Sequence, residues 1–187
     1  MKYRRGFKTE ANSYAREMRS ELNIEPHGSL CPWKLAKHLG YIVVKLSDFS
    51  SAEPKAVAYL TSGAGQAEFS AVTLPYGATP WIVHNDSHSP GRQAANLAHE
   101  AAHGLLCHQA APLTDAHGAR IFNREQENEA NWLGPALLIS EEAAIHIAEQ
   151  RFPHAAACQM YGVSLELLQM RLRVTGASVR VARRRAA

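Results

Sequence analysis

Residues 94–106 read AANLAHEAAHGLL, an apolar run that holds His99 and His103 with Glu100 between them. The spacing of the apolar side chains predicts an α-helix. Four residues advance a helix by about 400° and about 6 Å, so both imidazoles project from one face. Two imidazoles at this spacing can bind one zinc ion, with Glu100 beside them but not needed as a ligand. Bound zinc lowers the pKa of its water to about 7, and Glu100 can accept the proton when that water attacks a carbonyl carbon.

A catalytic zinc site usually has a third protein ligand, and the segment REQENEA further along the chain offers Glu125, Glu127 and Glu129. We favour Glu129, because it shares a helical face with Leu133 and Leu137, the expected core side. Glu127 lies on a less apolar line and Glu125 precedes Glu129 by one turn, so both stay open as alternatives. The loop between the two helices is long enough for the second helix to return antiparallel beneath the first.

Hydrophobic periodicity, proline positions and glycine stops divide the rest of the chain into elements. The expected helices cover 7–22, 32–39, 90–108, 124–138 and 141–152, and the expected strands cover 41–46, 57–61, 69–74 and 81–84. This pattern predicts an α+β fold. One small, mainly antiparallel sheet packs on a zincin-type helix pair that carries the HExxH motif, with helices before it and a helical extension after it.

Length and composition indicate one globular domain with a small appendage. The chain has 187 residues, of which 46% are hydrophobic and 20% charged, so it can bury a core without disulfides. The three cysteines have no paired spacing, the N-terminus is polar, and no apolar run is long enough to span a bilayer. We therefore expect a cytoplasmic protein without membrane association, with a zinc-binding domain over residues 1–152 and a basic extension over residues 153–187.

The C-terminal extension is basic and helical. Residues 151–187 carry seven basic side chains and one acidic side chain. Residues 155–174 form two helical stretches around a glycine turn, a pattern typical of a helix-turn-helix. Arg171 and Arg173 could meet DNA phosphates, but they lie late in the second helix, so a packing role is favoured over reading DNA. Residues 183–185 are expected to form a solvated tail that binds phosphate weakly and without specificity.

Several stretches resemble the ImmA/IrrE metallopeptidases. They are WIVHN (81–85), HSPGRQ (88–93), LAHEAAHGLL (97–106) and ENEANWL (127–133), with weaker similarity in RGFK (5–8) and CPWKLAKHLG (31–40). The resemblance implies Zn²⁺ as the cofactor. It also implies His99, His103 and Glu129 as the metal ligands and Glu100 as the catalytic carboxylate. The triplet around Glu129 is similar to the third-ligand segment of thermolysin-like enzymes as well.

The same resemblance implies a zinc metalloendopeptidase that hydrolyses a peptide bond in a specific partner protein. The partner is typically a helix-turn-helix transcriptional repressor, cleaved in a stress or mobile-element response. The strand over 81–84, if it lies at the sheet edge, could pair with an extended segment of substrate. The alternative is a DNA-binding regulator with a structural or inactive zinc site, in which the basic C-terminal region binds nucleic acid. No residue is assigned to stabilise the oxyanion.

Four side chains near the motif are interpreted as ordinary. His84 follows an apolar strand and is expected to be a partly buried, hydrogen-bonded histidine. Cys107 is expected to be a small core residue, and Arg92 is left open between a surface role and a role in substrate binding. His108 lies about 140° further round an ideal helix than His103, so we expect it at the surface and not beside the zinc.

Overall fold

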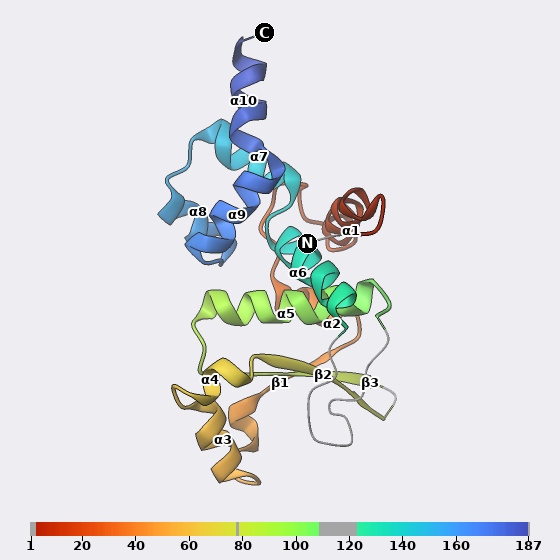
Figure 1. The fold of residues 1–187 in the computed structure, drawn as a ribbon, viewed down its shortest axis with the longest axis vertical. Helices are drawn as coiled ribbons and strands as arrows, with labels where there is room; N and C mark the ends of the chain where they lie inside the picture. Colours follow the sequence, from red (N-terminus) through yellow and green to blue (C-terminus); the bar gives the residue numbers. More distant parts are fainter. Residues whose placement is uncertain (1–2, 78, 109–122, 187) are drawn as a thin grey trace.

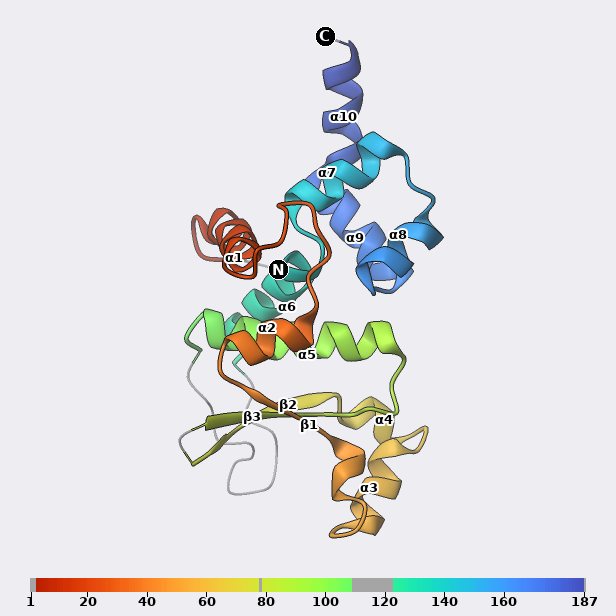
Figure 2. The same ribbon diagram turned by 180° about the vertical axis from the view of Figure 1, so that it is seen from behind.

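Figure 1 shows the computed structural model of the chain, which describes residues 3–77, 79–108 and 123–186. A three-stranded sheet lies on one side of α5, and α6 crosses α5 on its other side (Figures 1 and 2). None of the described helices is both long and apolar enough to cross a membrane. In chain order the described elements are α1 (Phe7–Glu21), α2 (Pro32–His38), β1 (Ile42–Lys45), the 3-10 helix η1 (Leu46–Phe49), α3 (Pro54–Thr61), α4 (Gly65–Glu68), β2 (Ala71–Tyr76), β3 (Thr79–His84), α5 (Pro90–Leu105), α6 (Arg124–Leu138), α7 (Glu141–Gln150), α8 (His154–Tyr161), α9 (Leu165–Thr175) and α10 (Ala177–Ala186).

The sheet contains one parallel and one antiparallel pair of strands. Its order is β1-β3-β2, with Val43 facing Ile82 in the parallel pair and Val72 facing Val83 in the antiparallel pair. The sequence predicted a mainly antiparallel sheet, because strand patterns alone do not show that the chain crosses over and returns parallel to β1. β3 lies between the other two strands, so residues 81–84 do not meet the condition, a place at the sheet edge, under which they could pair with a substrate.

Residues 57–61, expected to be a strand, form the second half of α3. Pro54 occupies the first turn of this helix, where its fixed φ suits the helix and its missing N–H costs nothing. Val57 is the buried residue of α3, so this apolar run contributes one side chain to the core from a helix and not from a strand. The proline start and two alanines outweigh the β-propensity of the segment.

Both faces of α5 are packed. Towards the sheet, Leu97 shares a buried cluster with Ile82 of β3 and Ala36 of α2. Towards α6, Ala101 shares a second cluster with Leu133 and with residues of α1. Close packing on two sides fixes the rotation of α5, and with it the direction of the side chains that lie between the two packed faces.

The C-terminal helices α7 to α10 pack together at the end of the molecule opposite the sheet (Figure 2). Their buried core includes Ile147 and Leu168 and reaches Ala98 of α5, so these helices rest on the helix that carries the histidines. The two helices expected within residues 155–174 are present as α8 and α9. They are joined by a turn in which Gly162 has a φ of 63°, a conformation that glycine adopts without strain.

The arginines at 183–185 are exposed, as the sequence predicted, but they lie on a helix, α10, and not in a frayed tail. Val181 of this helix is buried. Arg180 pairs with Glu141, and Arg184 pairs with Glu149 at 3.0 Å. Val181 anchors the helix, and the acidic side chains of α7 that face these arginines are too distant in sequence to be recognised from the local pattern.

Two buried arginines hold the C-terminal end of α6. Nη2 of Arg19 donates to the carbonyl of Leu138 at 3.2 Å, and Nε of Arg171 donates to the carbonyl of Ile139 at 2.9 Å. Both side chains are 1% exposed, and burial lowers the pKa of each guanidinium to about 10. The negative end of the helix dipole favours cations at this position. Arg171 therefore has the packing role that the sequence favoured and is not available to DNA phosphates.

Candidate metal centre

His99 and His103 lie one turn apart on α5 and face the same side of the helix. Their Nε2 atoms are 3.0 Å apart, and their ring centroids are 4.7 Å apart. α6 approaches this turn closely because Gly134 has no side chain. A Cβ atom at Gly134 would lie 3.1 Å from the backbone Cα and N of His99.

Glu127 of α6 completes a group of three potential metal ligands. Its carboxylate oxygens lie 3.3 Å from Nε2 of His99 and 3.6 Å from Nε2 of His103. One donor atom from each residue lies within 4.8 Å of the others. Two imidazole nitrogens and one carboxylate form the donor set of a catalytic zinc site, in which the fourth position is left to water. The residues present therefore fit a zinc ion.

Glu129, which the sequence favoured as the third ligand, is not in this group. Its Oε2 lies 3.3 Å from Nε2 of His108, and its Oε1 accepts a hydrogen bond from Nε of Arg4 at 2.9 Å. Two residues along a helix rotate by about 200°, so Glu127 and Glu129 project from opposite sides of α6. The sequence argument placed the third ligand on the leucine side of α6, whereas Glu127 lies on the side with Gly134, which faces the backbone of His99. Among the described residues, the geometry therefore brings Glu127, and not Glu129, together with the two histidines.

Glu100 lies between the two histidines in sequence but outside the ligand group. Its side chain is nearly buried, and Oγ1 of Thr73 donates a hydrogen bond to its Oε2 at 2.7 Å. Sequence reasoning did not identify Thr73. The alternation of a strand could have placed Thr73 on the same face as buried Ala71, but nothing in the pattern placed that face beside Glu100.

His108 is not at the surface, contrary to the expectation from the sequence. Its side chain is 7% exposed, and its Nδ1 lies 3.0 Å from Nδ1 of His103. The expectation assumed a helix that continues to residue 108, but α5 ends at Leu105. Cys107 then adopts a left-handed conformation with a φ of 50°, and this turn brings His108 back towards the helix. Cys107 itself is exposed and is not the core residue that the sequence predicted.

A cleft of about 310 Å³ opens beside the ligand group, between β2 and α6. Its described lining includes Ser70, Ala71, Asn96, Glu127 and Asn131. β2 is an edge strand of the described sheet, so its outer main-chain groups have no described strand beside them. The cleft, which His99 and Glu127 line, therefore connects the ligand group to a strand edge that an extended peptide could pair with.

Arg92 and His84 support the structure around the cleft in different ways. Nη2 of Arg92 donates to the carbonyl of Gln66 at 3.0 Å and to Oγ of Ser70 at 3.3 Å, so it fixes the connection between α4 and β2. His84 is buried, and burial lowers its pKa. Its Nδ1 has no hydrogen-bond partner among the described residues, whereas the sequence predicted a hydrogen-bonded histidine at this position.

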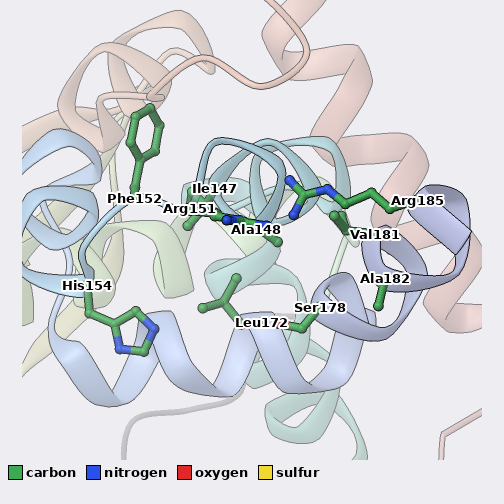
Figure 3. Close-up of a pocket in the computed structure, with 10 residues that line it drawn as sticks. All are labelled: Ile147, Ala148, Arg151, Phe152, His154, Leu172, Ser178, Val181, Ala182 and Arg185. Carbon is green, nitrogen blue, oxygen red and sulfur yellow. The ribbon is translucent and has the colours of Figure 1, made fainter.

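Figure 3 shows a second cavity, of about 280 Å³, between α7, α9 and α10. Arg151, His154 and Arg185 line it together with Leu172 and Val181. None of the three potential metal ligands, His99, His103 and Glu127, is among its described lining residues. This cavity belongs to the packing of the C-terminal helices and is separate from the candidate metal centre.

Two histidines and a carboxylate on packed helices, with a further glutamate beside an open cleft, are typical of a metal-dependent hydrolase. Residues 55–173 match the IrrE N-terminal-like domain family, a family of peptidases, and the chain belongs to this family. The match confirms the resemblance to the ImmA/IrrE metallopeptidases. It extends past the domain boundary expected after residue 152 and ends within α9. The comparison with curated proteins gave no match.

Proposed function

We propose that the chain is a zinc-dependent endopeptidase in which His99, His103 and Glu127 bind the metal and Glu100 is the general base. The observation that carries this proposal is the convergence of three donor atoms, within 4.8 Å of one another, at the cleft that Glu100 also lines. Membership of a peptidase family supplies the reaction class, hydrolysis of a peptide bond. The donor set supplies the reason to expect zinc.

Zinc at this site would lower the pKa of a water molecule and polarise the carbonyl of the scissile bond. Glu100 accepts a proton from the attacking water and delivers it to the nitrogen of the leaving peptide. The hydroxyl of Thr73 holds one oxygen of the Glu100 carboxylate at 2.7 Å, so the base keeps one orientation through both transfers. Because Glu100 is nearly buried, this hydrogen bond is stronger than it would be in water.

We further propose that the substrate binds as an extended segment along β2. The sequence offered residues 81–84 for this role if they lay at the sheet edge, but β3 is paired on both sides. β1 and β2 are the two edge strands of the described sheet, and Ser70 and Ala71 at the start of β2 line the cleft beside Glu127. Main-chain pairing at that edge would set which peptide bond faces Glu100.

The partner that we propose is a helix-turn-helix repressor, cleaved in the cytoplasm during a stress or mobile-element response. This part of the proposal comes from the family resemblance and from the charge of the cleft. Glu68, Glu100 and Glu127 line the cleft, and no lysine or arginine is among its described lining residues. An acidic cleft favours a basic peptide segment, and DNA-binding proteins are rich in such segments.

The alternative of a DNA-binding regulator has weaker support. Arg171 is buried against α6, and the exposed first turn of α9 carries Leu165 and Glu166. A carboxylate at the N-terminal end of a recognition helix repels phosphate, and this end is the one that usually contacts bases. For the basic surface of α10 we propose no more than weak, salt-dependent binding of nucleic acid.

Zinc content tests the metal centre. We expect wild type and Glu125→Ala to purify with close to one zinc per chain and Glu127→Ala to lose it, because Glu127 supplies the third donor while Glu125 is exposed. Elemental analysis after dialysis measures this. Zinc-free wild type after reconstitution, or full zinc in Glu127→Ala, would contradict the assignment.

New protein N-termini test the activity. Cell extract treated with wild type should gain a small set of new N-termini, each dependent on the protein, and extract treated with Glu100→Gln should not. The substitution removes the proton acceptor and is expected to slow cleavage by about 10²-fold to 10⁴-fold while zinc content stays at the wild-type level. Equal cleavage by Glu100→Gln would contradict its role as general base.

A further inference from the structure

We propose that Glu129 and His108 are positioning residues that hold His103 in one tautomer, with its proton on Nδ1 and the lone pair of Nε2 directed at the metal. The proposal rests on the proposed function, because it takes His103 to be a metal ligand. It gives Glu129 a role one step behind the ligands, in place of the direct ligation that its sequence position suggested.

The three side chains form a continuous chain of contacts that starts at the ligand group. Nε2 of His103 faces the ligand group, 3.0 Å from Nε2 of His99. On the other side of the same ring, Nδ1 of His103 lies 3.0 Å from Nδ1 of His108. Nε2 of His108 then lies 3.3 Å from Oε2 of Glu129.

Starting from the Glu129 end, hydrogen-bond direction sets the positions of the protons on the two rings when both are neutral. An ionised carboxylate accepts and cannot donate, so Nε2 of His108 carries the proton that faces Glu129. Nδ1 of His108 is then an acceptor, and the proton in the 3.0 Å contact must belong to Nδ1 of His103. Nε2 of His103 is left with a lone pair on the side of the ligand group. The opposite tautomers would place a lone pair against the carboxylate.

Burial and a fixed charge keep this chain in place. The side chains of His108 and Glu129 are 7% and 15% exposed, so water competes little for their hydrogen bonds. The second oxygen of Glu129 accepts from Nε of Arg4 at 2.9 Å, and Arg4 pairs with Glu10 at 2.6 Å. Arg4 thus fixes the carboxylate, which fixes His108 and through it His103. Outer partners of this kind orient metal-binding histidines in many metal sites.

α6 consequently supplies two carboxylates with different roles. Glu127 projects towards α5 and the ligand group, while Glu129, about 200° further round the helix, projects towards His108. The turn at Cys107 is the other requirement, because without its positive φ the ring of His108 would not return to His103.

The test begins with the metal-free protein. Nitrogen NMR of the histidine side chains, at a pH of about 8 where free imidazole is neutral, reports which ring nitrogen carries the proton. We expect His103 of wild type to be protonated on Nδ1 and His108 on Nε2. His108→Phe keeps a ring but removes both hydrogen bonds, and we expect His103 to become a mixture of tautomers. His103 protonated on Nε2 in wild type would overturn the proposal.

Zinc affinity, measured by competition with a chelator, gives the second readout. We expect His108→Phe to bind zinc about 10-fold to 100-fold more weakly than wild type, and Glu129→Gln to be weakened less, because its amide oxygen can still accept from His108. Glu127→Gln should lose far more affinity, and Glu125→Gln should match wild type. Wild-type affinity in His108→Phe, or equal losses in Glu129→Gln and Glu127→Gln, would overturn the proposal.

The two proposals fail in different ways. If wild type binds no zinc, the proposed function fails, yet the tautomer of His103 in the metal-free protein still decides whether Glu129 and His108 orient that ring. If wild type binds zinc through Glu127 and His103 shows the other tautomer, the proposed function stands and the positioning role is excluded. Should His108→Phe not fold, the wild-type tautomer and the Glu129→Gln affinity decide the matter.

Discussion

At the scale of single residues, Thr73 has a role that can be separated from metal binding. Its hydroxyl donates to Glu100 and is not among the potential ligand atoms. A hydrogen bond to a charged group contributes about 1.5 to 3 kcal/mol, and about 1.4 kcal/mol corresponds to a tenfold change in rate. Thr73→Val should therefore lower the rate of substrate cleavage by about tenfold or more at unchanged zinc content. Thr73→Ser, which keeps the hydroxyl, should cleave at close to the wild-type rate, and equal rates for the valine and serine variants would contradict the role.

His84 makes stability depend on pH. Burial lowers its pKa in the folded chain, with Asp86 and Asp48 opposing the shift. Below about pH 6.5, the ordinary pKa of histidine, the unfolded chain binds more protons at this position than the folded chain does. The free energy of unfolding linked to His84 is thus fully present above that pH and falls as the pH drops through it towards the lowered folded pKa.

Urea unfolding with a chelator present measures this effect. Lowering the pH from about 8 to about 5 should reduce the free energy of unfolding of wild type more than that of His84→Asn, which has no imidazole to protonate. His154→Asn, a change at an exposed histidine, should follow wild type. Parallel pH curves for wild type and His84→Asn would contradict the expectation.

At the scale of the elements, the contact of α5 with α6 depends on Gly134. A methyl group there would lie 3.1 Å from the backbone of His99, and backbone atoms cannot move aside as a flexible side chain can. Gly134→Ala should push the helices apart, cost about 1 to 3 kcal/mol of unfolding free energy and weaken zinc binding. The measurements are thermal unfolding and chelator competition. Gly63→Ala, at a glycine with open space around it, is the matched control and should change neither value markedly.

Most of the longer helices were predictable because each carries its own start, stop and apolar period, whereas α3 and α10 were not expected as helices. The helix expected over 124–138 has the bounds of α6, where the side chain of Asn123 accepts from the backbone N–H of Glu125. The strands were less predictable, since order and direction depend on partners distant in sequence. No local signal in β1 indicates that it will run parallel to β3.

In the candidate site, the residues that lie on one helix were predictable, and those that depend on contacts between elements were not. His99, Glu100 and His103 belong to one helix, so spacing alone places them together. The identity of the third ligand depends on which side of α6 faces the histidines. Glu127 lies on the side of Gly134, whose lack of a side chain lets α6 approach the backbone of His99. Thr73, His108 and the role of Glu129 follow from tertiary contacts and could not be read from periodicity.

At the scale of the whole molecule, zinc and folding should be coupled. A ligand that binds the folded chain alone stabilises it by about 2.7 kcal/mol at a free concentration of about 100 times its Kd. For a chain of this length that shift corresponds to a rise in Tm of about 5 to 10 °C. Thermal scans with and without added zinc should show this rise for wild type and none for Glu127→Ala. A similar rise in both proteins would mean that zinc binds elsewhere.

The two arginines that bind the C-terminal end of α6 come from different parts of the chain, and only one of them lies in the segment that matches the family. Arg171 lies inside the segment that matches the family, but Arg19 lies before it, as do α1, α2 and β1. Those elements cover α6 with Phe7, cover α5 with Ala36 and give β3 its parallel partner. Residues 55–173 expressed alone would leave these apolar faces bare and the carbonyl of Leu138 without its donor. We therefore expect residues 55–173 alone to be less stable than the whole chain, because the residues before them cover apolar faces of α5 and α6.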